Sequence, residues 1–343
     1  MARHARHACH AHLVKATEPS IARAADLLRA GQPVAFPTET VYGLGADTFN
    51  EAALDRVFEL KGRPMDNPLI AHVLGPAGAR RVAVGWDDRC ERLARRCWPG
   101  PLTIVLGRAR SVPPRATAGW PSIAVRAPAH PVARALLEAF GGPVSAPSAN
   151  KSGGVSPTTA AHVVADFADA GDLLVLDGGA CEVGIESTVV DLTTDVARVL
   201  RPGSVTVRQL GELLGEAVEA VEVVDVGMGR AATQGLSPGT SMRHYAPRTA
   251  TELVDEQALP GRLAELSEPV AVLCFDDAPV APPHRAIVMP RTAQAYAARL
   301  YAALREADEV PGAMILVVRP PSQEGLWSAV VDRLGRATHH RAR

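Results

Sequence analysis

The chain has 343 residues, which at roughly 150 residues per domain predicts two domains. Hydrophobic residues make up 47% of it and charged residues 21%, a balance that supplies a sizeable core and excludes a disordered chain. The net charge of -1 excludes recruitment of nucleic acid or an anionic membrane by a global positive field, so a nucleic-acid site would need a local basic patch.

Cysteines and apolar runs exclude further classes of protein. The five cysteines are scattered and form no C-x-x-C motif, which argues against a disulfide framework or a structural zinc site. No uncharged apolar run approaches the roughly 18 residues of a membrane span. The basic N-terminus lacks the apolar core of a signal peptide. We therefore expect a cytoplasmic protein that contacts no membrane.

The first segment of the chain, residues 1–15, is crowded with histidines around one cysteine. Such a tract could bind a metal ion, or it could be a frayed extension. No apolar period packs it against a core, so we favour a disordered tail.

Helices and short strands alternate from Thr17 onward. The first helix begins at Thr17 and ends at Gly31, and Asn50 caps a second helix that ends at Gly62. Further helices are expected at 87–97, 130–140, 157–168 and 207–214. Strands are expected at 33–36, 69–73, 102–106, 123–126, 144–146, 173–176 and 188–192. This alternation predicts an irregular, mixed sheet covered by helices.

The pattern weakens after residue 215. Small and polar residues without a period predict a linker over 216–247. A smaller α/β unit follows, with strands at 270–275, 286–289 and 313–318 and helices at 292–307 and 325–335. The chain thus divides into a tail (1–15), a first α/β domain (16–215), a linker (216–247) and a second domain (248–337).

Cations at the ends of expected elements are the first candidate site residues. Arg63, Arg126 and Arg201 each stand beside a proline-containing turn, and Lys61 is one of only three lysines among 36 basic residues. A rigid turn holds a guanidinium toward a carboxylate or phosphate at small entropic cost. Without matching acids nearby in sequence, the three arginines predict a polyanionic ligand; isolated surface salt bridges are the alternative.

A hydroxyl-rich turn, residues 144–154, follows one expected strand and supplies short donors, two glycines and a lysine. Ser156 then stands where the N-cap of the next helix is expected, with Pro157 at its first position. A helix N-terminus in such surroundings can receive an anion, although plain capping explains Ser156 equally well.

Other motifs are weak or fail. The glycines after Thr40 tempt a dinucleotide-binding reading, but Thr48 stands where the third glycine should be. No P-loop or H-E-x-x-H sequence occurs, which argues against phosphate-loop and metalloprotease chemistry. A lone histidine on a buried strand, such as His72, is more often a core residue than a functional one. Glu186, in the segment Gly184-Ile-Glu-Ser-Thr188, is by itself also weak evidence of a functional site.

Six segments of the first domain together carry a more specific signal: Pro37–Gly45 (PTETVYGLG), Lys61–His72 (with KGRP and NPLI), Trp98–Thr103 (WPGPLT), Ala124–Pro128 (AVRAP), Ser145–Asn150 (SAPSAN) and Arg201–Gly203 (RPG). In this order they resemble the Sua5/YrdC family, the threonylcarbamoyl-AMP synthases of tRNA t6A modification. Ser237-Pro-Gly239 and His244-Tyr-Ala-Pro247 resemble the linker of the longer Sua5 form. The resemblance implies a YrdC-like twisted mixed sheet joined to a small Rossmann-like Sua5 domain.

The resemblance also implies a reaction. L-threonine, bicarbonate and ATP, with Mg²⁺, would give threonylcarbamoyl-AMP and pyrophosphate for the modification at tRNA position 37. The protein would act as a nucleotidyltransferase without a metal site of its own. It would hand its product to the tRNA threonylcarbamoyl transferase complex, and we expect no stable nucleic-acid binding.

The resemblance assigns roles to individual residues. The positions implied for ATP are Lys61, Arg63, Asn67, Ser122, Ser148, Ser156, Arg201 and Tyr245. The positions implied for threonine are Thr40, His72, Arg126, Ala146 and Ser187. Lys61 and Arg63 would be catalytic, because they would stabilise the charge on the leaving pyrophosphate.

The linker departs from the family pattern. Where the family carries Met-Lys and an aromatic residue before His-Tyr-Ala-Pro, this chain has Thr240, Ser241 and Met242 before Arg243. Two other functions stay open at this point: an RNA-binding module that uses the same basic surface, and carbamoyl transfer on a related scaffold. Few aromatic residues argue against the first, and the lack of zinc-finger and acylphosphatase-like neighbours argues against the second.

Overall fold

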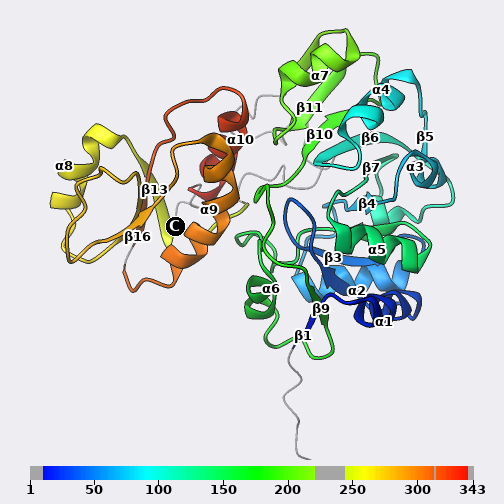
Figure 1. The fold of residues 1–343 in the computed structure, drawn as a ribbon, viewed down its shortest axis with the longest axis horizontal. Helices are drawn as coiled ribbons and strands as arrows, with labels where there is room; N and C mark the ends of the chain where they lie inside the picture. The colour runs from blue at the N-terminus through cyan, green and yellow to red at the C-terminus, as the bar shows by residue number, and fades with distance from the viewer. Residues whose placement is uncertain (1–10, 221–243, 313, 339–343) are drawn as a thin grey trace, which may run out of the picture.

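The computed structural model describes residues 11–220, 244–312 and 314–338, which form two α/β domains (Figure 1). The first domain contains a twelve-stranded mixed sheet in the order β1-β9-β2-β3-β8-β4-β7-β6-β10-β11-β12, with β5 paired to β6. Its strands are β1 (His12–Lys15), β2 (Val34–Phe36), β3 (Gly43–Asp47), β4 (Ile70–His72), β5 (Ala83–Val84), β6 (Leu102–Arg108), β7 (Ser122–Arg126), β8 (Val144–Ala146), β9 (Leu174–Asp177), β10 (Thr188–Asp191), β11 (Ala197–Arg201) and β12 (Val218–Ala220).

The helices of the first domain cover this sheet and bury its apolar side chains. They are α1 (Glu18–Arg29), α2 (Glu51–Lys61), α3 (Pro76–Val82), α4 (Asp88–Cys97), the 3₁₀ turn η1 (Pro114–Thr117), α5 (Pro131–Phe140), α6 (Ala160–Asp166) and α7 (Val207–Leu214). Capping explains the ends of α2: the Asn50 side chain accepts a hydrogen bond from the Ala53 amide, and Gly62 adopts φ +59°. That left-handed turn redirects the chain directly after Lys61.

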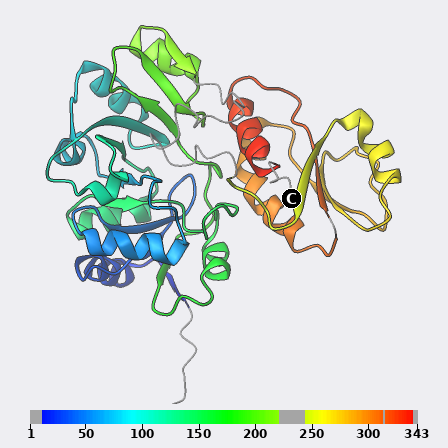
Figure 2. The same cartoon turned by 180° about the vertical axis from the view of Figure 1, so that it is seen from behind.

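The second domain is a four-stranded parallel sheet in the order β13-β16-β14-β15. Its elements are β13 (Ala250–Val254), the 3₁₀ turn η2 (Glu256–Ala258), α8 (Leu259–Ala264), β14 (Ala271–Cys274), β15 (Arg285–Val288), α9 (Ala293–Asp308), β16 (Met314–Val318) and α10 (Leu326–Ala337). Figures 1 and 2 show α9 and α10 on the side of this domain that faces the first one. One apolar cluster is continuous across the two, because Val41, Val155 and Ile185 pack with the core of the second domain.

Two predicted boundaries are wrong. The tail does not extend to residue 15, because His12–Lys15 form β1 and pair in parallel with β9. The linker does not begin at 216, because Val218–Ala220 form β12 and pair with β11. The helix expected at 157–168 is shorter, since α6 begins after Thr159, whose side chain accepts a hydrogen bond from the His162 amide. Within the described ranges, no helix is long and apolar enough to cross a membrane.

Candidate functional site

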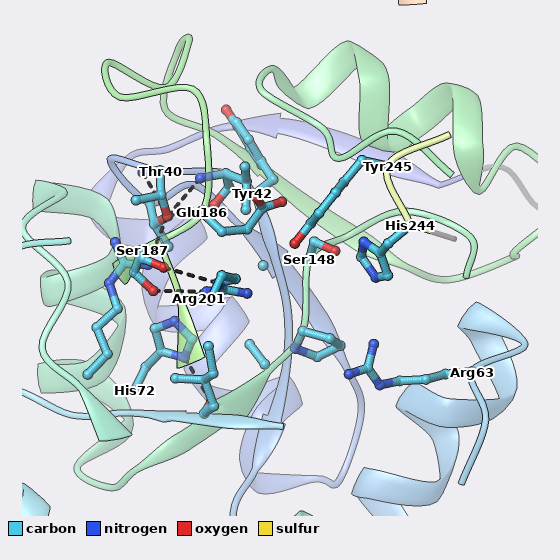
Figure 3. Close-up of a pocket in the computed structure, with 17 residues that line it drawn as sticks. Thr40, Tyr42, Arg63, His72, Ser148, Glu186, Ser187, Arg201, His244 and Tyr245 are labelled. Atoms are coloured by element: carbon cyan, nitrogen blue, oxygen red, sulfur yellow. Dashed lines mark hydrogen bonds between the residues drawn. The ribbon is translucent and has the colours of Figure 1, made fainter. Parts of the chain in front are cut away.

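A pocket lies where β3, β4 and β8 meet the segments around Thr40, Ser187 and Tyr245 (Figure 3). Its labelled side chains fall into two groups. Thr40, His72, Ser187 and Arg201 lie on one side, and Arg63, Ser148, His244 and Tyr245 lie on the other.

Arg126 anchors the first side of the pocket from the end of β7. Its Nη1 donates to Thr40 Oγ1 at 2.8 Å, and its Nη2 lies 2.7 Å from Glu39 Oε1. Burial would raise the pKa of Glu39, but the charge and hydrogen bond of Arg126 lower it below its ordinary value. The Thr38 hydroxyl, 2.9 Å from that of Thr40, completes the cluster. The arrangement holds a hydroxyl and a guanidinium in fixed positions at the pocket wall.

His72, at the end of β4, is buried beside this cluster. Its Nδ1 lies 3.0 Å from the Ile70 carbonyl oxygen, and Phe36 packs edge-on against the ring at 5.9 Å. Burial, together with the charge of Arg126, lowers the pKa of His72 to about 4. The imidazole is therefore neutral near pH 7 and provides a polar contact instead of a positive charge.

Ser187 and Arg201 meet at the adjoining ends of β10 and β11. Arg201 donates from Nε to the Ser187 carbonyl and from Nη2 to Ser187 Oγ, each at 3.1 Å. Ser187 Oγ also lies 2.7 Å from Thr103 Oγ1. The turn after β11 comes so close to this segment that a Cβ on Gly203 would lie 2.3 Å from the Thr188 amide nitrogen. Only glycine fits there, which fixes Arg201 against Ser187.

Two buried cations serve the second side of the pocket: Arg63 lines it and Lys61 lies behind it. Lys61 Nζ donates to the carbonyls of Ser148, at 2.5 Å, and of Asn150. Arg63 donates from Nε to the Asn67 carbonyl at 3.1 Å and from Nη2 to Asn67 Oδ1 at 2.6 Å. Within the described part of the chain, neither cation forms an ion pair with a carboxylate.

The electrostatics of these two cations favour an anion. Burial and the nearby Arg63 lower the pKa of Lys61 well below its ordinary value, and burial lowers that of Arg63 to about 10. Both groups are desolvated and like-charged, so an anionic ligand would stabilise their charged forms. Ser148, whose hydroxyl donates to Asn150 Oδ1 at 2.5 Å, stands between Lys61 and the pocket.

His244 and Tyr245 cover the second side. Their rings meet edge to face at 4.1 Å, and Tyr245 adopts φ +61°, a strained conformation for a bulky residue. Burial lowers the pKa of His244 to about 3, so its ring is neutral. Both His244 Nδ1 and the Tyr245 hydroxyl are buried without a hydrogen-bond partner among the described residues. Buried polar atoms of this kind, at the wall of a pocket, are suited to a polar ligand.

Comparison with known proteins places the chain in a family. Residues 26–203 match the Sua5/YrdC family model described as "Telomere recombination", and residues 205–338 match "Threonylcarbamoyl-AMP synthase, C-terminal domain". The chain is 37% identical to the threonylcarbamoyl-AMP synthase of Pyrococcus abyssi over 93% of this chain and 94% of that protein. It is 39% identical to that of Bacillus subtilis, with 93% of each covered. The chain belongs to the Sua5/YrdC family.

Solved Sua5 structures share the fold. Sua5 of P. abyssi complexed with L-threonine is 37% identical with a TM-score of 0.86, over 95% of this chain and 96% of that one. A variant of the same protein, in which a histidine and a tyrosine are replaced by alanine, also gives a TM-score of 0.86 at 35% identity, over 97% and 100%. The predicted fold class, a YrdC-like mixed sheet with a small Sua5 domain, is confirmed.

The pocket brings together most of the residues that the Sua5/YrdC resemblance implied. Those that line it are Thr40, Arg63, His72, Arg126, Ala146, Ser148, Ser187, Arg201 and Tyr245. Lys61 and Asn67 lie behind this lining and contact it through Ser148 and Arg63. The roles of all these residues stay predictions.

Two implied residues lie elsewhere. Ser122 begins β7 and is not among the lining residues. Ser156 is not the N-cap of α6, because the chain continues to Thr159 before the helix begins; its hydroxyl instead donates to Glu186 Oε1 at 2.6 Å. The expectation that the arginines lack acidic partners is also wrong for Arg126, because its guanidinium forms an ion pair with Glu39, the residue before Thr40.

Sequence reasoning missed part of the lining. Thr38 and Glu186 both line the pocket, although neither was given a site role: Glu186 stood only in a weak motif, and Thr38 only in the segment that carries the family resemblance. Thr240, Ser241 and Met242 of the altered linker, and the histidines before residue 11, lie outside the described residues. Among the described residues, no group of three His, Cys, Asp or Glu side chains could hold a metal ion.

Proposed function

We propose that this chain is a threonylcarbamoyl-AMP synthase that acts as a nucleotidyltransferase on ATP. The observation that carries the proposal is one pocket with two different sides. Lys61 and Arg63, two buried cations with no acidic partner among the described residues, serve one side, and a small niche of hydroxyls and Arg126 forms the other. The first suits a polyphosphate and the second suits a small hydroxy amino acid.

The nucleotide is assigned to the side of Arg63, Ser148 and Tyr245. Lys61, Arg63 and Arg201 would contribute positive charge toward the phosphates, and a guanidinium is well shaped to bind phosphate oxygens in pairs. The unpartnered hydroxyl of Tyr245 faces the same side and is a further candidate contact. Asn67 supports this arrangement by holding the Arg63 guanidinium.

L-threonine is assigned to the niche of Thr40, His72, Arg126, Ala146 and Ser187. The Arg126 guanidinium would face the carboxylate, and the hydroxyls of Thr40 and Ser187 would contact the polar groups of the substrate. His72 is neutral and would act as a hydrogen-bond partner. A solved Sua5 relative bound to L-threonine supports this substrate.

The reaction follows from placing the two substrates side by side. The threonine amine adds to CO₂ derived from bicarbonate, loses a proton and becomes a carbamate. A carbamate oxygen then attacks the α-phosphorus of ATP, and the bond to the β-phosphate oxygen breaks with release of pyrophosphate. The protein would contribute orientation of the two substrates and positive charge, from Lys61 and Arg63, on the leaving group.

Mg²⁺ would enter as part of the MgATP substrate. The described residues supply no cluster of carboxylates, and Mg²⁺ in nucleotide sites is commonly held by phosphate oxygens and water with one or two protein ligands. The product, a reactive mixed anhydride, must be consumed by an enzyme that transfers the threonylcarbamoyl group. We assign that role to the tRNA-modifying transferase complex, with no stable nucleic-acid binding by this chain.

Mass spectrometry of a reaction with purified protein, ATP, Mg²⁺, bicarbonate and L-threonine tests the proposal. We expect an adenylate that carries threonine and a carboxyl unit, together with an equal amount of pyrophosphate. Replacement of threonine by serine is the control and should lower the yield. Intact ATP after incubation with folded protein would contradict the proposal and favour a non-catalytic binding module.

A further inference from the structure

A buried carboxylate at the pocket has hydrogen-bond donors from both domains. Glu186 precedes β10 and lines the pocket beside Ser187. Its Oε2 accepts hydrogen bonds from the Tyr301 hydroxyl at 2.7 Å and from Arg333 Nε at 3.0 Å, and its Oε1 accepts one from Ser156. Tyr301 belongs to α9 and Arg333 to α10, so the second domain supplies two of the three donors.

The cluster of Glu186, Tyr301 and Arg333 is almost entirely buried. Arg333 is 1% exposed and Glu186 is 6% exposed. Burial would raise the pKa of Glu186, but Arg333, Arg201 and the hydrogen bonds from Ser156 and Tyr301 lower it to about 2. Glu186 is therefore a carboxylate near pH 7, and its orientation depends on these donors.

The backbone on either side of Glu186 is equally constrained by the second domain. Gly184 adopts φ +74°, and a Cβ there would lie 2.4 Å from the Ala298 Cα of α9. The segment that leads to Ser187 therefore packs directly on the helix backbone. A displacement of α9 would move this segment, and with it the Ser187 atoms that Arg201 contacts.

The same two residues of the second domain also support Tyr245. The Tyr245 ring stacks on Tyr301 with centroids 5.6 Å apart and an angle of 27° between the rings. The Arg333 guanidinium lies over the Tyr245 ring, 5.4 Å from its centroid. Tyr245 thus keeps its strained backbone conformation at the pocket wall against a platform from α9 and α10.

We propose that Tyr301 and Arg333 are positioning residues for the reaction, acting through Glu186 and Tyr245 to set the pocket wall that binds the substrates. The second domain is then a structural component of the active site, although neither residue is among those that line the pocket. This inference rests on the proposed function, and it adds a role for residues distant in the sequence.

Arg305 of α9 provides a matched control, because it contacts the first domain without contacting Glu186 or Tyr245. It spans the same interface, with an ion pair of 2.6 Å to Asp166 and a hydrogen bond to the Val155 carbonyl. None of its partners lines the pocket. An Arg305→Met variant therefore weakens docking of the domains and leaves the contacts of Glu186 and Tyr245 intact.

The decisive experiment compares steady-state kinetics of the full-length Tyr301→Phe and Arg305→Met variants. Phenylalanine keeps the ring beneath Tyr245 and removes only the hydroxyl that binds Glu186. We expect Tyr301→Phe to raise the KM for L-threonine and for ATP at least fivefold, and Arg333→Lys to do the same more strongly. Arg305→Met should leave both KM values within twofold of the parent protein.

A structural role alone predicts a different result, because loss of folded protein lowers kcat and leaves KM unchanged. Unchanged KM values in Tyr301→Phe, or equal increases in Arg305→Met, would overturn the inference. Crystal structures of the parent protein and Tyr301→Phe supply a readout independent of turnover. Displacement of Glu186 or Tyr245 in the variant is expected, and retention of both in place counts against positioning. A parent protein that makes no product would instead reject the proposed function.

Discussion

Lys61 and Arg63 show how a binding site can be recognised from single residues. A buried cation normally has a carboxylate partner, because desolvation of a charge is costly. Here the donors of both side chains are directed to carbonyl oxygens, which satisfy hydrogen bonds without neutralising the charge. The missing negative charge is what an anionic ligand would supply.

Removal of the positive charge of Arg63 or of Arg201 should abolish activity and leave the protein folded. We expect Arg63→Ala and Arg201→Ala each to lower ATP-dependent formation of the adenylate by a factor of about 100 or more. Each would remove a charge-assisted contact proposed for phosphate, and such a contact is worth on the order of 3 kcal/mol in a dry site. Arg208→Ala, on the exposed face of α7, is the matched control. Circular dichroism and thermal unfolding check the fold. Unchanged turnover in both site variants would refute the phosphate assignment.

The buried histidines predict a pH dependence of stability. Burial lowers the pKa of His72 to about 4 and that of His244 to about 3, whereas an unfolded histidine titrates near 6.5. Between these values the unfolded chain binds more protons than the folded one, so the free energy of unfolding falls as the pH falls from about 6.5 toward 4.5. Glu186, whose pKa is lowered to about 2, adds to the loss mainly below this window, because an unfolded glutamate titrates near 4.3.

A His72→Asn variant tests this explanation. It removes one titrating group, so the slope of the unfolding free energy against pH should decrease by up to about 1.4 kcal/mol per pH unit. Urea unfolding at several pH values between 4.5 and 6.5 gives the slope. An undiminished slope in His72→Asn would show that His72 is protonated in the folded protein.

At the scale of elements, the sequence predicted those helix ends that are determined by capping residues close by in the chain. The side chain of Asn50 and the left-handed Gly62 bound α2, as expected from capping alone. Other elements depend on contacts with distant parts of the chain. Strand β1 is short and mostly exposed, and it exists through pairing with β9, more than 150 residues later. The sequence of strand β3 resembles a glycine-rich turn, because its glycines allow close contact with neighbouring side chains. A Cβ on Gly45 would lie 2.6 Å from the Val144 side chain.

The residues of the candidate site also divide into those that neighbouring residues identify and those that depend on distant parts of the chain. Arg63 and Ser148 stand in turns, and Arg201 ends β11 directly before one. The proline, glycine and hydroxyl residues of these turns are visible in the local sequence, and the structure brings the three residues to one pocket. The significance of Glu186 could not be read, because its partner Arg333 lies 147 residues away in another domain. An arginine within an amphipathic helix looks like a solvated residue until the fold places it in an interface.

At the scale of the whole molecule, the two domains are joined by a polar cluster inside an apolar contact. Val41, Val155 and Ile185 bury apolar area against the second domain, while Glu186 and Arg333 form an ion pair with almost no access to solvent. Such a pair is weak evidence of net stability, but breaking it leaves a single buried charge, which is strongly unfavourable. The pair therefore couples the unfolding of one domain to that of the other.

A double-mutant cycle on Glu186→Gln and Arg333→Met measures this coupling through urea unfolding. Arg333→Met should lower the free energy of unfolding by about 3–5 kcal/mol, because it leaves the Glu186 carboxylate buried without its ion-pair partner. Glu186→Gln should cost less, because Arg333 keeps an ion pair of 2.8 Å with Asp332. The double variant should lose less than the sum of the two, with a coupling free energy above about 1 kcal/mol. The Asp166→Asn and Arg305→Met pair crosses the same interface with more solvent access, so its coupling should stay below about 1 kcal/mol. Additive losses in the first cycle would show that the Glu186–Arg333 pair does not couple the two domains.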